Sequence, residues 1–127
     1  MARTKSFDES IILRQVAGVF AECGYAGASI DQLVAATGLK RGSLYQAYAS
    51  KAGLFRESFR FAVSEAAHLN TVADLLIVAL WERAAVDAKV SELCVEAIEK
   101  LQVAYGEPIE QTIYQRLQKR AALNKQE

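Results

Sequence analysis

The chain has 127 residues, of which 52% are hydrophobic and 24% charged, with 15 basic side chains balancing 15 acidic ones. This length supports one hydrophobic core, and this composition excludes a disordered chain. The longest apolar run, Leu75–Trp81, is far shorter than the roughly 20 residues of a membrane span, and the N-terminus has no secretory h-region. With only Cys23 and Cys94, a disulfide scaffold is excluded and a reducing, cytoplasmic setting is expected.

The balanced total charge hides an uneven distribution. Residues 1–60 carry eight basic and five acidic side chains, a net +3, and residues 61–127 carry seven and ten, a net −3. A difference of this size decides little by itself, because it matters only if the basic side chains meet on one face.

The first predicted helix covers about residues 7–23. Ser6 and Glu9 fit a capping box at its start, and Gly24 fits a left-handed stop after which Tyr25 packs back over the last turn. Between them, apolar side chains recur at steps of three and four residues, which predicts one buried helical face; they are Ile12, Val16, Val19, Phe20 and Cys23.

Two short helices are predicted next, with a tight turn between them. Ser29 and Gln32 fit a second capping box, and the helix that they open ends at Thr37-Gly38. Another helix covers 41–48, and Ser50 is a plausible cap for the longer helix that follows it. Two short helices braced by longer ones are typical of a helix-turn-helix, so an all-α fold is expected.

The helix over 41–48 has a polar face. At about 100° per residue, Leu44, Ala47 and Tyr48 turn inward. Basic groups and amides can bond to guanine and adenine edges, and a tyrosine can contact a phosphate or a thymine methyl. A glycine lets the backbone approach the sugar-phosphate chain closely. The residues expected to face DNA are Lys40, Arg41, Gly42, Ser43, Tyr45 and Gln46.

Two helix N-termini can present amides to a phosphate. Ser29 caps one of them and Lys51 begins the other. Because a helix N-terminus carries partial positive charge, both positions are suited to hold the DNA backbone. Such contacts fix the docking geometry, while the side chains of 40–46 supply sequence information.

Residues 1–60 resemble the N-terminal DNA-binding domain of the TetR family of bacterial transcriptional repressors. The resemblance is carried by Phe20–Ile30 and by Leu39–Tyr48 with the following Ser50-Lys51. It implies that Ser29, Tyr48 and Lys51 contact phosphates. It also implies that the side chains expected to face DNA lie in the major groove. No cofactor is implied.

The rear half is shorter than the ligand-binding domain of that family. We expect the helix that follows Ser50 to end near Leu69, an apolar helix over about 75–86, a helix capped by Asp87, and a last amphipathic helix after Gly106-Glu107-Pro108. About three helices therefore follow the fourth, and an enclosed inducer cavity is not expected.

A helix as apolar as 75–86 needs cover on all sides, and a second copy of the chain supplies it. Packing of the last two helices against their copies would also place two recognition helices about 34 Å apart, one turn of B-DNA. We therefore predict a homodimer. Trp81 and Tyr105 are interpreted as dimer or domain core.

Catalysis and metal binding are not expected. The chain has no glycine-rich phosphate loop, no metal-ligand cluster and no nucleophile–base pair. His68 is interpreted as a surface or packing residue and the two cysteines as core residues. The acids Glu92, Glu96 and Glu99 are interpreted as a solvated helix face.

Together, these patterns predict a helix-turn-helix domain over 1–49 and a helical connector and dimerisation region over 50–127. The expected function is that of a bacterial, nucleoid-associated regulator, a repressor that binds a palindromic operator in double-stranded DNA as a dimer. Two alternatives stay open: a shortened family member that pairs with a full-length relative, and a small-molecule sensor, of unknown effector, whose pocket forms between subunits.

Overall fold

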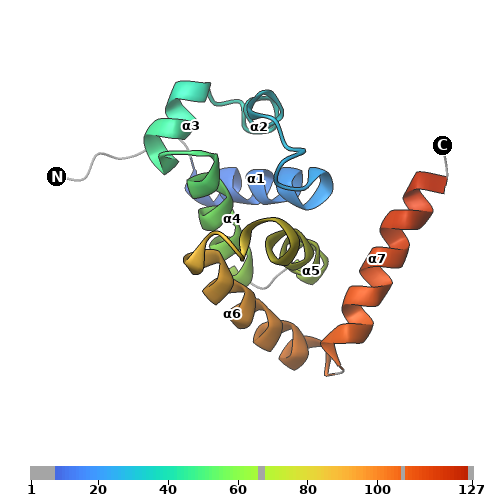
Figure 1. The fold of residues 1–127 in the computed structure, drawn as a ribbon. Helices are drawn as coiled ribbons and strands as arrows, with labels where there is room; N and C mark the ends of the chain where they lie inside the picture. The colour runs from blue at the N-terminus through green and yellow to red at the C-terminus, as the bar shows by residue number, and fades with distance from the viewer. Residues whose placement is uncertain (1–7, 66–67, 107, 126–127) are drawn as a thin grey trace.

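The computed structural model describes residues 8–65, 68–106 and 108–125, with side chains through residue 122. Every element in these ranges is helical, which confirms the all-α prediction. None of the described helices is long and apolar enough to cross a membrane. The elements are α1 (Glu9–Cys23), α2 (Ile30–Thr37), α3 (Arg41–Tyr48), α4 (Lys51–Glu65), α5 (Leu69–Val78), the π-helical turn η1 (Ala79–Arg83), α6 (Ala88–Tyr105) and α7 (Ile109–Lys125) (Figure 1).

The start of α1 differs from the prediction. Asp8 is the N-cap, and its carboxylate accepts a hydrogen bond from the backbone N–H of Ser10 at 3.0 Å, so α1 begins at Glu9 and not near residue 7. The reason is that a carboxylate next to the first helical turn satisfies a backbone amide and favours the positive end of the helix. Hydrogen bonding from the Ser10 side chain also lowers the pKa of Asp8. The capping box predicted for Ser6 and Glu9 falls in part outside the described residues.

The other predicted caps of the front half are confirmed. Ser29 and Gln32 form a reciprocal capping box at the start of α2, and Gly38 ends this helix in the left-handed conformation. Ser50 caps α4, because its hydroxyl accepts from the backbone N–H of Gly53 at 3.0 Å. Gly24 ends α1 at φ 81° and ψ 175°, a positive φ outside the left-handed helical region that we expected.

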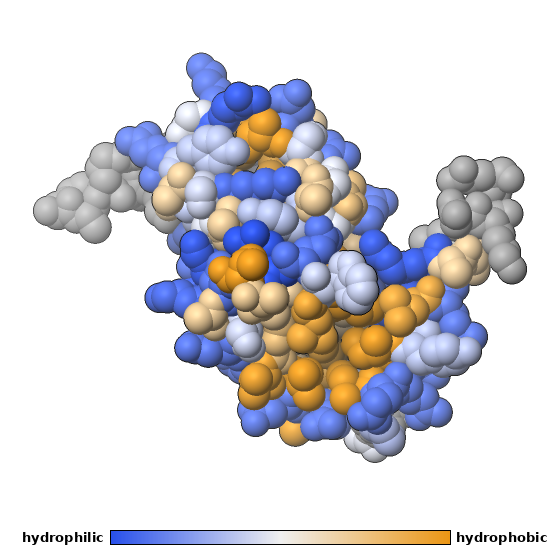
Figure 2. Space-filling model, viewed as in Figure 1, coloured by the Kyte–Doolittle hydropathy of each residue, from blue (hydrophilic) through white to orange (hydrophobic). Residues whose placement is uncertain are grey.

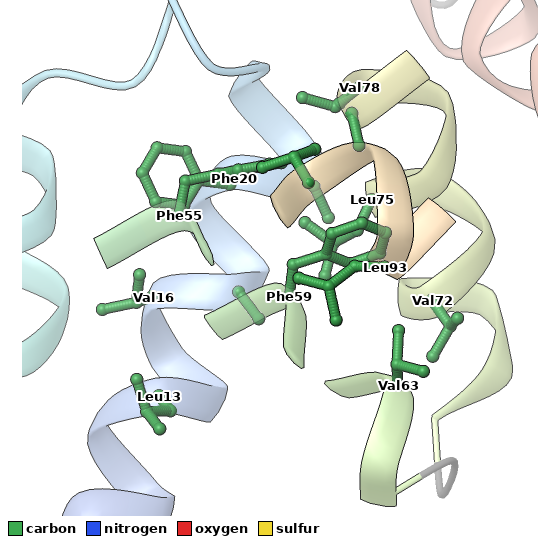
Figure 3. Close-up of a cluster of buried hydrophobic side chains, with 14 of the residues drawn as sticks. Leu13, Val16, Phe20, Phe55, Phe59, Val63, Val72, Leu75, Val78 and Leu93 are labelled. Atoms are coloured by element: carbon green, nitrogen blue, oxygen red, sulfur yellow. The ribbon is translucent and has the colours of Figure 1, made fainter. Parts of the chain in front are cut away.

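One continuous core joins the front and rear halves (Figure 3). Its centre is aromatic: Phe20 of α1 meets Phe55 of α4 edge to face at 5.1 Å between ring centroids, and Phe59 lies 5.8 Å from Phe55. Tyr25 stacks on Phe20 at 5.9 Å, as predicted for a residue that packs back over the last turn of α1. Each fully buried side chain of this size contributes about 1.5–3 kcal/mol, so the core fixes α1 and α4 relative to each other.

The boundaries of α4 and α5 differ from the prediction. The fourth helix ends at Glu65 instead of near Leu69, and Leu69 begins the helix that we expected from residue 75. The apolar periodicity continues from Leu54 to the end of the second helix with neither glycine nor proline in the sequence, so it does not mark the break. The apolar helix then ends at Arg83 in the π-helical turn.

Helix α6 begins and ends where the sequence predicts, and α7 begins after Pro108, as expected. Asp87 caps α6, and Gly106 ends it in the left-handed conformation. From there α7 runs back past α5 towards the end of α1 (Figure 1). Arg116 of α7 donates two hydrogen bonds to Asp74 of α5, at 2.9 and 2.8 Å, so a charged bidentate pair holds α7 against α5.

Candidate nucleic-acid interface

Helix α3 has the orientation that the sequence predicts. Leu44 and Tyr48 are buried and fix the helix to the core. Tyr45 is half-buried and packs against the core, so its ring is less exposed than we expected. The remaining predicted base-facing residues are exposed: Lys40, Arg41, Gly42, Ser43 and Gln46.

Gly42 packs against no other part of the chain that the structure describes. A Cβ atom built at this position would meet no atom within 4 Å. Since glycine weakens a helix relative to alanine, α3 gains no stability from it. The position leaves the backbone of α3 open to an approaching surface.

An acid lies beside the basic end of α3. The guanidinium of Arg41 is 3.7 Å from the carboxylate of Asp31 on α2, and the Asp31 side chain is 92% exposed. The sequence prediction missed this neighbour, because it considered the residues of α3 alone. The contact is long and solvent-exposed, so it holds Arg41 only weakly and leaves the guanidinium available.

Two of the three predicted phosphate contacts, Ser29 and Lys51, lie at helix starts, as expected. Ser29 is exposed and accepts a hydrogen bond from the Gln32 backbone N–H at 3.1 Å. The ammonium of Lys51 lies 4.8 Å from the ring centroid of Tyr25, in the loop that leads to Ser29. The structure therefore places Lys51 of α4 beside the loop that joins α1 to α2.

Tyr48 has a different position from the other predicted contacts. Its side chain is buried, and its hydroxyl donates a hydrogen bond to the carboxylate of Glu9 on α1 at 3.0 Å. Burial, together with the hydrogen bond to Glu9, raises the pKa of Tyr48, so the phenol stays protonated and continues to donate. A phosphate contact by Tyr48 stays a prediction, and it requires the hydroxyl to leave Glu9.

The rear half contributes residues that sequence reasoning missed. Glu82 accepts hydrogen bonds from the backbone N–H groups of Tyr25 at 3.0 Å and Ala26 at 2.9 Å. Arg83 lies over the Tyr25 ring, 4.4 Å from its centroid. More than 50 residues separate these partners along the chain, and no local pattern predicts such a contact.

The remaining titratable residues form no metal site among the residues described. His68 is exposed and precedes α5, and Glu92, Glu96 and Glu99 are exposed on α6, as predicted. Cys94 is buried, whereas Cys23 is half-buried and accepts a hydrogen bond from the Gln32 amide at 3.6 Å.

Residues 12–58 match the family described as "Bacterial regulatory proteins, tetR family". A 55-residue stretch is 42% identical to the "Uncharacterized HTH-type transcriptional regulator YezE" of Bacillus subtilis (strain 168). This stretch is 43% of the present chain and 28% of that relative, so the match covers less than a third of the regulator. No solved structure matches the chain. The matched residues contain α2, α3 and most of α1, and they extend into α4.

Proposed function

We propose, on the premise that residues 12–58 belong to the TetR family of bacterial regulatory proteins, that the chain binds DNA by sequence and regulates transcription. One observation supports this most strongly: within the matched residues, α3 buries Leu44, while Gln46 on the opposite side and Arg41 at the first turn stay exposed. An enzyme is not proposed, because the family consists of regulators.

We assign the roles of individual residues by their chemistry. The Arg41 guanidinium and the Gln46 amide read base edges in the major groove, flanked by Lys40, Ser43 and Tyr45. Gly42 admits the sugar-phosphate chain. Ser29 and Lys51 hold phosphates at the starts of α2 and α4.

We propose a homodimer formed through the rear half. An open apolar groove runs between α5, α6 and α7, and a large apolar surface lies on this side of the molecule (Figure 2). Trp81, which follows the groove residue Leu80, is 88% exposed, so it does not belong to the core of a single chain. Monomeric proteins rarely expose apolar patches larger than a few hundred Å². The groove is lined by Glu110 and by the apolar or aromatic residues Leu76, Leu80, Ile98, Ile109, Ile113, Tyr114 and Leu117.

A two-fold dimer would present two α3 helices to successive major grooves. Their spacing of about 34 Å corresponds to one turn of B-DNA and to a palindromic operator. Bound at a promoter, such a dimer would exclude RNA polymerase, and we therefore propose a repressor that acts in the bacterial cytoplasm.

Selection of duplexes from a random DNA library, at a fixed salt concentration, tests this function. A palindromic consensus with two half-sites is expected. If the selected pool shows no sequence preference, the assignment of a sequence-reading regulator is wrong. Pairing with a full-length relative would then account better for the exposed apolar groove.

Sedimentation velocity at micromolar concentration tests the dimer. The parent chain is expected to sediment as a dimer. Leu117→Glu places a charge in the groove, where Leu117 is 46% exposed, and should yield monomers. Ile11→Glu is the matched control, because Ile11 is 48% exposed on α1, away from the groove. A monomeric parent, or a dimeric Leu117→Glu variant, would contradict the proposed interface.

A further inference from the structure

The loop between α1 and α2, residues 24–29, is held by a side chain from the rear half. One oxygen of the Glu82 carboxylate accepts from the Tyr25 N–H at 3.0 Å, and the other accepts from the Ala26 N–H at 2.9 Å. Bonds between a carboxylate and backbone amides are shorter and stronger than neutral ones. Glu82 therefore fixes two consecutive peptide units just before α2.

A π-helical turn brings Glu82 to this loop. The backbone N–H of Ala84 donates to the carbonyl of Ala79 at 2.8 Å, which adds a residue to the helical turn. A π-helical turn shifts the phase of the residues that follow it, and such turns are frequent at functional sites. Here Trp81 is exposed, whereas Glu82 and Arg83 contact Tyr25.

The loop is shaped to receive this carboxylate. Gly24 has φ +81°, and a Cβ atom at this position would lie 2.9 Å from the Glu82 carboxylate oxygen. A Cβ atom at Gly27 would lie 2.2 Å from the carbonyl oxygen of Cys23. Two glycines therefore let the loop approach both Glu82 and the end of α1 closely.

A second rear element contacts the other side of the same turn. Arg120 of α7 donates hydrogen bonds to the carbonyl oxygens of Ala21 at 2.8 Å and Glu22 at 3.3 Å. These carbonyls belong to the last turn of α1, immediately before the loop. The rear half thus bonds to the backbone on both sides of Gly24, through Glu82 and Arg120.

We propose that Glu82 is a positioning residue for DNA docking. It holds the α1–α2 loop so that Ser29 and the start of α2 meet a phosphate while α3 lies in the major groove. The inference rests on the proposed DNA-binding function. In this proposal, the rear half of the chain influences the DNA affinity of the front half through the π-helical turn.

For a substitution of Glu82 by a neutral side chain of the same size, the change in charge and the loss of loop positioning predict opposite effects on DNA affinity. Glu82→Gln removes a negative charge, which by electrostatics alone strengthens the attraction to DNA. An amide offers one acceptor oxygen and turns an NH₂ group towards the second backbone N–H, so at least one of the two hydrogen bonds is lost at unchanged size. If Glu82 positions the loop, the variant binds more weakly despite its more favourable charge.

The experiment compares the full-length parent, Glu82→Gln and Glu96→Gln on a duplex selected by the parent and on a scrambled duplex. Glu96 is exposed on α6, so its variant is the control for the change of charge. We expect Glu82→Gln to bind the selected duplex about tenfold more weakly, within the usual range of coupling between sites. The slope of its log affinity against log salt concentration should be smaller in magnitude by about 1, as expected for one lost phosphate contact. Glu96→Gln should match the parent.

The slope of log affinity against log salt distinguishes a role of Glu82 in positioning the loop from a role in the stability of the fold. Partial unfolding of Glu82→Gln lowers the apparent affinity but leaves the slope unchanged, and that result would overturn the inference. Equal or tighter binding by Glu82→Gln would also overturn it, while the proposed function would stand. A parent that binds neither duplex would instead refute the proposed function, and this inference with it.

Discussion

The hydroxyl of Tyr48 donates a hydrogen bond to the carboxylate of Glu9 at 3.0 Å, and this bond joins the last residue of α3 to the first residue of α1. Of these two helices, α3 carries the exposed residues that we propose to read DNA, and α1 carries Phe20 of the aromatic core. The bond therefore fixes the C-terminal end of α3 against the start of α1.

Tyr48→Phe should lower stability without lowering DNA affinity. Loss of this hydrogen bond is expected to reduce the free energy of unfolding by about 0.5–1.5 kcal/mol, measured by urea denaturation. Binding to a selected duplex should stay within about twofold of the parent, since one such bond contributes little to docking. Tyr105→Phe is the control, because its hydroxyl bonds to Asn70 at an exposed site. A large loss of affinity would instead support the phosphate contact that the family resemblance implies for Tyr48.

Gly42→Ala should raise stability and weaken DNA binding. Alanine is favoured over glycine in a helix by about 0.5–1 kcal/mol, and the new methyl group meets no atom of the chain. The same methyl group would stand between α3 and the DNA backbone. Gly18→Ala on α1 is the matched control, since its Cβ atom also meets nothing within 4 Å. We expect Gly18→Ala to gain stability at unchanged affinity, and equal affinities for both variants would rule out a close DNA approach at Gly42.

Asp31→Asn should strengthen DNA binding. The substitution removes an exposed acid that lies 3.7 Å from Arg41, so it reduces the repulsion of phosphates and releases the guanidinium. At low salt we expect a gain of about two- to fivefold that shrinks as salt is added, because exposed charges are screened. Glu92→Gln carries the same change of charge on the exposed face of α6 and should have no effect. Weaker binding by Asp31→Asn would mean that the pair with Arg41 is needed for docking.

Cys94 should be unreactive towards thiol reagents at neutral pH. Burial raises the pKa of its thiol to about 11, so the thiolate that reacts is scarce until the pH approaches this value. Titration with an alkylating reagent at pH 7 should therefore modify the half-buried Cys23 first. Modification of Cys94 should appear on unfolding. Rapid labelling of native Cys94 would show that the core around α6 opens readily.

Local sequence chemistry predicts the front half well. The cap at Ser29, the stop at Gly38 and the inward turn of Leu44 each depend on residues within one or two helical turns, and the structure has all three. Because Ser29 and Gly38 fix where α2 begins and ends, the position of α3 after the turn is predictable, and the exposure of Gln46 opposite Leu44 follows from helical periodicity.

Contacts between distant segments could not be predicted in this way. Asp31 reaches Arg41 only because α2 packs against α3, and Glu82 reaches Tyr25 only because a π-helical turn changes the phase of its helix. The break between α4 and α5 was missed for a related reason: the apolar pattern continues across it, so periodicity gives no sign of the change in direction.

The ratio of affinities for a selected and a scrambled duplex shows whether the exposed residues of α3 read base pairs. Arg41→Ala and Gln46→Ala should each lower this ratio, by about 1–3 kcal/mol of discrimination per lost base contact. Lys51→Ala should weaken binding to both duplexes alike and flatten the salt dependence, as expected for a phosphate contact. If Arg41→Ala and Gln46→Ala keep the ratio of the parent, α3 does not read the sequence and the account is contradicted.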